Sequence, residues 1–223
     1  MKAAIKVLFT LLLFCEGGQA QGFINLNFES ARIVPIPDGE YGAYSIATTN
    51  ALPGWTVYYG SSQQSQITYN DPAIGSTFVT LYATNGQQLS GNYSVLLQGG
   101  QSASAASISQ TGLVPSSAES LLFEGQQTGV GTLQVSLGSQ DLSLFAISNA
   151  LNYTLYGVDI STFAGQTEQL MFSALENPTG YNNWNIDNIQ FSSSPIPEPS
   201  AIGLSALGGL LLAWRHRRKI SRI

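Results

Sequence analysis

The chain is nearly free of cysteine and histidine, with one of each among its 223 residues. Cys15 lies near the N-terminus and His216 near the C-terminal end. The segment between them, residues 21–194, therefore forms no disulfide and offers no thiol nucleophile. It also lacks the histidine that a Ser-His-Asp triad or a histidine metal site requires.

Positive charge is almost as scarce in this segment. The chain has 13 acidic and 8 basic residues, but 11 of the acids and only one base, Arg32, fall within residues 21–194. Their balance gives the segment a net charge of −10. Without lysine it forms no Schiff base. Without a basic patch it has nothing to neutralise phosphates, so we expect no nucleic-acid partner.

The low content of charge does not indicate disorder, because aromatic residues are plentiful. The chain contains 10 phenylalanines, 10 tyrosines and 3 tryptophans, whereas disordered chains have few aromatics. Residues 21–194 are therefore expected to fold, and their length fits one domain. The surface must be solvated mainly by Ser, Thr, Asn and Gln, which suits an extracellular matrix protein.

Helical periodicity is also missing from residues 21–194, where apolar and polar residues alternate with the period of two that is typical of strands. Short turn sequences such as Pro53-Gly54 and Gly99-Gly100 separate these runs. We predict an all-β fold, a single β-sandwich or jelly roll. Residues 60–66 and 101–112 are predicted as loops, although Ser107–Ser109 could begin a strand. The predicted strands contain the sets Ile24/Leu26/Phe28, Trp55/Val57/Tyr59, Phe78–Tyr82, Tyr93/Val95/Leu97, Leu121/Phe123, Leu133/Val135/Leu137, Leu142/Leu144, Tyr153/Leu155 and Ile189/Phe191.

The first twenty residues have the three-part layout of a secretory signal peptide. Lys2 and Lys6 form a basic start, and Val7–Cys15 is apolar. A small-x-small site ends at Ala20, which predicts cleavage between Ala20 and Gln21. The domain that follows is therefore expected outside the cytoplasm.

The last segment, residues 195–219, has three parts. Residues 195–200 are rich in proline and should be extended. Residues 201–214 are small or apolar and predict a short transmembrane helix of roughly 21 Å. A basic cluster at residues 215–219 follows, in which Arg215, Arg217, Arg218 and Lys219 place the C-terminus in the cytoplasm. The precursor is thus expected to be anchored in the inner membrane.

The order Ile196-Pro197-Glu198-Pro199, short apolar run and basic end resembles the PEP-CTERM sorting signal of Gram-negative bacteria. In that family valine most often precedes the motif, and Ile196 is a conservative departure. The resemblance implies that an exosortase-type membrane protease, acting after the secretion machinery, removes the tail near Pro197, Glu198 and Pro199. The cell surface or the extracellular matrix is then the destination. The alternative is an ordinary single-pass C-terminal anchor.

Both ends of the domain are similar to jelly-roll carbohydrate-binding (galactose-binding-like) modules. The similarity covers residues 25–29, 52–57 and 184–189. In those modules the first and last strands lie near one another and often hold a structural calcium. By matching position, the resemblance implies Glu29 and Asp187 as calcium ligands, since calcium prefers hard oxygen donors. Calcium is the only cofactor expected. The alternative is that both carboxylates accept hydrogen bonds from loop amides.

Aromatic side chains can stack on sugar rings, and Tyr58, Tyr59 and Trp184 are the candidates for binding a polysaccharide. Glycosidase chemistry needs two carboxylates across a cleft, and no motif marks such a pair, so we expect no enzyme. Two function classes remain: a structural or adhesive protein of an exopolysaccharide matrix, and a discrete carbohydrate-binding module for a defined glycan. A glycoside-active enzyme is the weakest alternative.

Overall fold

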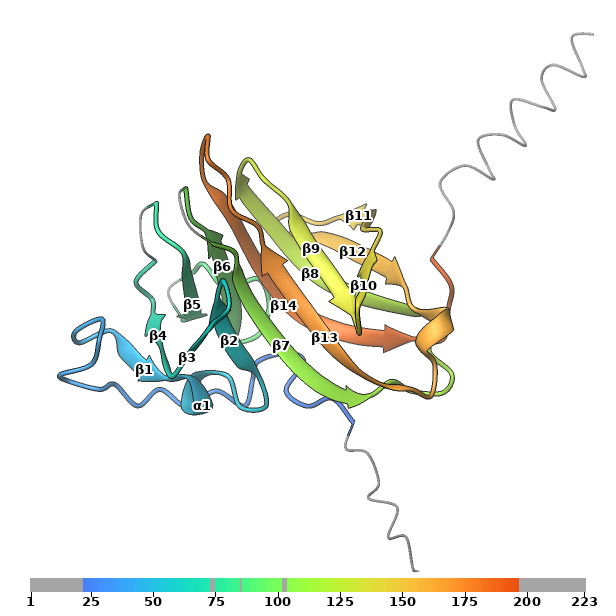
Figure 1. Ribbon diagram of the computed structural model, residues 1–223, viewed down its shortest axis with the longest axis horizontal. Helices are drawn as coiled ribbons and strands as arrows, with labels where there is room; N and C mark the ends of the chain where they lie inside the picture. The colour runs from blue at the N-terminus through green and yellow to red at the C-terminus, as the bar shows by residue number, and fades with distance from the viewer. Residues whose placement is uncertain (1–21, 73–74, 85, 102–103, 197–223) are drawn as a thin grey trace, which may run out of the picture.

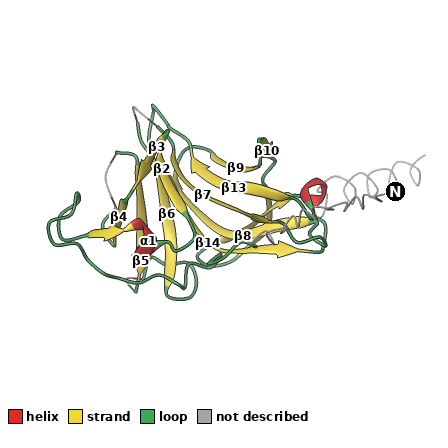
Figure 2. Ribbon diagram, turned by 60° about the horizontal axis from the view of Figure 1, so that its bottom comes forward, coloured by secondary structure: helices red, strands yellow, loops and turns green. Residues whose placement is uncertain are grey.

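The computed structural model describes residues 22–72, 75–84, 86–101 and 104–196, which form an all-β structure of two sheets (Figure 1). Figure 2 shows the sheets as two layers. Apart from the strands there are only a short helix, α1 (Thr48–Ala51), and a 3₁₀ turn at Ser161–Phe163. The all-β prediction is confirmed. The signal peptide, its cleavage site at Ala20 and Gln21, and residues 197–223 lie outside the described residues.

The larger sheet has eight strands and the smaller has six. All neighbouring strands run antiparallel except β4 and β5, which are parallel. The eight-stranded sheet has the order β1 (Ser45–Ala47), β4 (Gln66–Tyr69), β5 (Phe78–Ala83), β6 (Tyr93–Gly99), β14 (Asn182–Ser192), β8 (Ser120–Gly129), β12 (Thr154–Asp159), β11 (Phe145–Asn149). The six-stranded sheet has the order β10 (Gln140–Leu142), β9 (Leu133–Leu137), β13 (Thr167–Ala174), β7 (Ala106–Leu113), β2 (Thr56–Tyr59), β3 (Ser62–Gln64).

The core fills the space between the sheets, and a chain of aromatic rings crosses it. Trp55 and Phe172 belong to the side of the six-stranded sheet, with ring centroids 6.4 Å apart. Phe172 meets Phe123 of β8 edge to face at 5.1 Å. Phe123 stacks on Tyr156, which contacts Trp184. The Phe172–Phe123 pair thus joins the two layers.

Two loop predictions and one strand prediction are wrong, although the strand that Ser107–Ser109 could begin is confirmed as part of β7 (Ala106–Leu113). Residues 60–66 contain β3 and the start of β4, and residues 101–112 contain most of β7. In β7 the serines hide the alternation, because Ser107 donates a hydrogen bond to Ser173 of β13 at 2.8 Å and is buried. The Ile24–Phe28 set forms turns instead of a strand, since Asn25 and Phe28 have positive φ.

The N-terminal segment nevertheless lies beside the last strand, as the resemblance implied. The amide of Ile189 donates to the carbonyl of Leu26 at 2.9 Å, and the rings of Phe23 and Phe191 are 5.1 Å apart. These two contacts attach the N-terminal segment to β14. None of the helices within the described ranges is long and apolar enough to cross a membrane.

Candidate functional site

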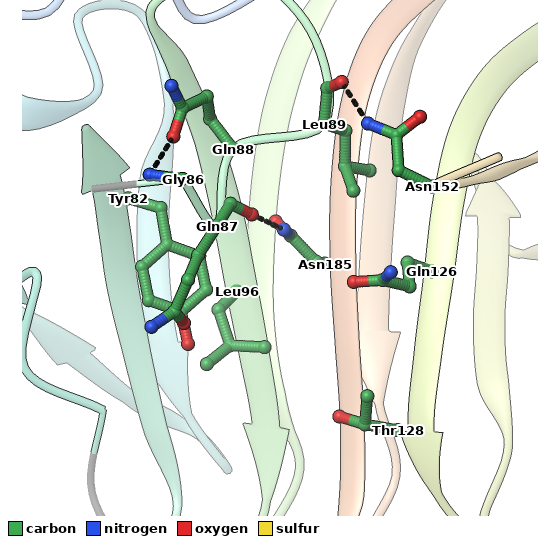
Figure 3. Close-up of a pocket in the computed structure, with 10 residues that line it drawn as sticks. All are labelled: Tyr82, Gly86, Gln87, Gln88, Leu89, Leu96, Gln126, Thr128, Asn152 and Asn185. Carbon is green, nitrogen blue, oxygen red and sulfur yellow. Dashed lines mark hydrogen bonds between the residues drawn. The ribbon is translucent and has the colours of Figure 1, made fainter. Parts of the chain in front are cut away.

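The candidate site is built around the described part of the β5–β6 loop, residues 84 and 86–92, which crosses the outer face of the eight-stranded sheet. Two asparagines bind its backbone. Asn185 Nδ2 of β14 donates to the Gln87 carbonyl at 2.8 Å. Asn152 Nδ2, between β11 and β12, donates to the Leu89 carbonyl at 2.7 Å. Figure 3 shows both contacts. The loop is therefore held by side chains from two other segments.

The same loop receives both carboxylates that the sequence singled out. Asp187 Oδ2 accepts hydrogen bonds from the amide and the hydroxyl of Ser90, both at 3.1 Å. Glu29 Oε1 accepts from the amides of Asn92 at 2.7 Å and Tyr93 at 3.2 Å. Glu29 Oε2 accepts from Asn92 Nδ2 at 2.8 Å. The structure thus brings Glu29 and Asp187 to one loop, from opposite ends of the chain.

This geometry matches the hydrogen-bonding alternative for the two carboxylates. A cluster of three or more histidine, cysteine, aspartate or glutamate side chains suited to a metal is not found in the part of the chain that the structure describes. Glu29 and Asp187 would have to exchange loop amides for the ion, with carbonyls supplying the remaining oxygens. Calcium binding by these residues stays a prediction.

Gly91 is the residue that the Glu29 contact depends on. Its φ is +57°, which favours glycine. A Cβ at this position would stand 2.2 Å from Glu29 Oε1. Gly86 of the same loop has φ +80° but has no atom within 4 Å of such a Cβ. Both glycines therefore have a positive φ, but only at Gly91 would a Cβ collide with a neighbouring side chain.

We expect Gly91→Ala to destabilise the fold more than Gly86→Ala. Both variants strain the backbone by about 1–2 kcal/mol, but only Gly91→Ala also displaces a carboxylate that accepts three hydrogen bonds, at about a further 1–3 kcal/mol. Denaturant unfolding of the full chain in detergent measures both losses. Equal losses in the two variants would show that the Glu29 contact contributes nothing.

Asp187 also faces a second buried acid. It is register partner to Glu124 of β8, and the two residues are 1% and 6% exposed. Asn188 joins them, since its amide donates to Asp187 Oδ1 at 2.7 Å and its Nδ2 donates to Glu124 Oε1 at 3.1 Å. Arg32, the only base of residues 21–194, is exposed, so no cation compensates the pair.

The environment of Asp187 favours its protonated form. Burial raises the pKa of Asp187 from 3.8 to about 7, and the charge of Glu124 adds to this rise. The hydrogen bonds from Ser90 and Asn188 act in the opposite direction and lower the pKa. The cause is desolvation, which penalises the charged form. Sequence reasoning found Asp187 but missed Glu124, because only the strand register places the two side chains together.

A β-bulge explains how Asp187 avoids the core. The β14–β8 register shifts between Asp187 and Gln190, and Asn188 has φ +49°. The shift puts Ile186 and Ile189 both into the core, whereas unbroken alternation would put them on opposite faces. Asp187 therefore lies on the outer face although its sequence parity matches that of Ile189.

The predicted sugar-stacking residues do not form one site. Trp184 is 4% exposed and packs in the core against Tyr156, so its role as a stacking surface is corrected. Tyr59 is half-buried; its hydroxyl accepts from the Val79 amide at 3.2 Å and its ring packs on Phe78. Tyr58 is half-exposed on the outer face of the six-stranded sheet, where it remains a candidate by itself.

Two adjoining hollows that the sequence did not reveal lie along β8 of the eight-stranded sheet. One, of about 240 Å³, lies between the β5–β6 loop and the sheet (Figure 3). The other, of about 390 Å³, follows β8 and the turn before β12. Gln126 and Asn152 line both, which makes them one groove, here called the amide groove. None of its described lining residues is charged.

The tail of the chain matches a known sequence family. The family described as the PEP-CTERM protein-sorting motif matches residues 195–219, so the chain carries this sorting motif at its C-terminal end. Among solved structures the chain is similar to the xyloglucanase domain of NopAA, a type three effector from Sinorhizobium fredii in complex with cellobiose. The identity is 11%, the match covers 73% of this chain and 100% of that chain, and the TM-score is 0.30. No curated protein matches the sequence.

Proposed function

We propose that the chain is a structural or adhesive protein of the cell surface or of an exopolysaccharide-containing matrix. The observation that carries the proposal is the PEP-CTERM motif at residues 195–219. Such a motif implies export, a membrane-anchored precursor and processing by an exosortase. Removal of the tail takes away five of the eight basic residues, Arg215, Arg217, Arg218, Lys219 and Arg222, and leaves a strongly acidic β-domain.

The segment that joins β14 to the Pro-Glu-Pro sequence is attached to the sheet, which supports a processing site close to the surface of the domain. β14 ends at Ser192, and Ser120 Oγ still donates to the Ser194 carbonyl at 2.7 Å. Ile196, directly before the Pro-Glu-Pro sequence, reaches β12, where its Cδ1 lies 2.4 Å from the place a Cβ on Gly157 would take. No separate linker intervenes between the sheet and Ile196.

The proposed role is not enzymatic. The buried pair of acids Asp187 and Glu124 lies below the β5–β6 loop and accepts hydrogen bonds from Ser90 and Asn188. Buried acids held in this way serve to fix a loop, whereas glycosidases require two carboxylates on either side of a bound sugar. We interpret the two sheets as a jelly-roll scaffold for the surface role.

Mass spectrometry of the C-terminus tests the sorting proposal. In the native host we expect the surface-exposed protein to lack every peptide beyond the motif, and to keep them when exosortase is absent. Replacing Pro197, Glu198 and Pro199 together by alanine should block removal of the tail. Pro195→Ala is the matched control and should be processed normally. An intact Ile223 on the surface-exposed wild-type protein would overturn the proposal.

The second candidate, a discrete carbohydrate-binding module, is favoured by the amide groove. Its lining is polar and uncharged, and ligand sites are typically concave with a few placed polar groups. This candidate is compatible with the first, because a matrix protein can adhere through a sugar site. The second candidate differs from the first in that it assigns the contact with the glycan to the residues of the amide groove.

A further inference from the structure

We propose that the amide groove binds a neutral oligosaccharide, with carboxamides contacting the sugar hydroxyls; this deepens the proposed surface role, on which its biological setting rests. The groove runs across β14 and β8, between the β5–β6 loop and the turn before β12. The site is distinct from the tyrosines of β2 that the sequence suggested.

The chemistry of the lining matches a polyhydroxylated ligand. Gln126 is exposed and presents both a donor and an acceptor, as a sugar hydroxyl does, and the exposed Asn152 lies beside it in the groove. Gln87 and Gln88 line the loop side, and both already take part in contacts, since Gln88 Oε1 accepts from the Gly86 amide at 3.0 Å. A groove this rich in carboxamides can pair several hydroxyls in sequence without requiring any charge on the ligand.

Charge argues against acidic ligands. A phosphate, sulfate or uronic acid would meet no cation in the groove, because none of its described lining residues is charged. The surrounding domain carries a net charge of −10, which repels anions at a distance. A neutral glycan needs no cation in the groove and is not repelled by the net charge of the domain, so the groove selects it over acidic polymers.

Asn185 supplies an acceptor without a protein partner. The residue is 4% exposed, and its Nδ2 is committed to the Gln87 carbonyl at 2.8 Å. Its Oδ1 is buried and accepts no hydrogen bond within the described structure. Buried polar atoms normally have partners, and a sugar hydroxyl can donate to this oxygen only after the side chain turns towards the cavity, because the atom is enclosed.

Size and apolar surface also fit a chain of sugars. The hollow along β8 has about 390 Å³, within the range of about 300–1,000 Å³ typical of ligand sites. It continues through Gln126 into the hollow below the loop. Tyr82 and Leu96 line the loop end, and Tyr153 and Tyr156 line the other end. Tyr82 and Leu96 are 6% and 5% exposed, so the half-buried Tyr153 is the side chain that can cover the C–H face of a sugar while the amides take its hydroxyls.

Calorimetric titration of the full chain in a zwitterionic detergent without sugar groups tests the proposal. The probes are cellohexaose, maltohexaose, mannohexaose and xylohexaose, with hexagalacturonate as the acidic counterpart. We expect saturable binding of at least one neutral hexasaccharide and at least tenfold weaker binding of hexagalacturonate. Absence of binding to all four neutral probes, or equal binding of the acidic one, would overturn the proposal.

A pair of glutamine variants locates the site. Gln126 is exposed on β8, so Gln126→Leu should leave the fold intact and weaken the bound neutral hexasaccharide about tenfold or more, since it leaves sugar hydroxyls unpaired. Gln63→Leu makes the same change at an exposed position on β3 of the other sheet and should bind like the wild type. Equal affinities of the two variants would place the sugar elsewhere. Neither result affects processing of the tail, so the two proposals fail separately.

Discussion

Replacing Phe172 by alanine is expected to lower the free energy of unfolding by about 3–5 kcal/mol. The side chain is fully buried and forms the contact between the layers, with its ring centroid 5.1 Å from that of Phe123. Removal leaves a cavity in the middle of the aromatic chain, and strands on both sides are too firmly paired to close it. The loss of dispersion contacts adds to the lost burial of the ring.

Denaturant unfolding of the full chain, followed by tryptophan fluorescence, measures the effect. Trp55 lies in contact with Phe172, so the emission of the folded variant should also change. Leu151→Ala removes an aliphatic side chain that is fully exposed and should alter stability by less than about 0.5 kcal/mol. A loss below about 1 kcal/mol for Phe172→Ala would contradict the bridging role of this ring.

Asp187→Asn is expected to change how stability depends on pH. The pKa of Asp187 is about 7 in the folded protein and 3.8 when the group is unperturbed. Between these values the folded state holds a proton that the unfolded state lacks, so the stabilisation present below pH 4 is lost as pH rises towards 7. The slope is at most about 1.4 kcal/mol per pH unit. Asparagine does not titrate, so the variant lacks this pH-dependent contribution to the free energy of unfolding.

The measurement is the free energy of unfolding at intervals from pH 4 to pH 8 for wild type and variant. We expect the difference between them to change in favour of the wild type as pH falls, and to level off above pH 7. Asp141→Asn removes the same charge from an exposed position on β10 and should keep the wild-type slope. Parallel curves for wild type and Asp187→Asn would rule out the buried protonated acid.

Alternation in the sequence predicted strands well where one face is apolar. Val57, Val79, Leu81, Val95 and Leu97 all enter the core as expected. Apolar alternation does not predict β7, because Ser107 and Ser109 are buried and form hydrogen bonds to β13 in the six-stranded sheet. A serine whose hydroxyl is hydrogen-bonded inside the protein is buried, but its polar side chain does not mark it as buried in the sequence.

The site was predictable only in part. The resemblance to jelly-roll carbohydrate-binding modules singles out Glu29 and Asp187, and the structure does bring both to the β5–β6 loop. Their common partner was not predictable, because Glu29 lies 63 residues from Asn92 in the sequence. The amide groove carries no sequence signal either, since Asn185 and Gln126 resemble the polar face of any strand.

The sequence by itself determined that the chain carries a sorting motif at residues 195–219, which chemistries residues 21–194 lack, and that they form strands. These properties follow from the composition and from the order of residues that are neighbours in the sequence. Only the tertiary structure decided that Trp184 is core, that Asp187 faces Glu124, and that a loop and two strands enclose an uncharged groove. Each of these depends on strand register and on the bulge after Asp187, and such long-range pairing is set by the packing of the whole sandwich.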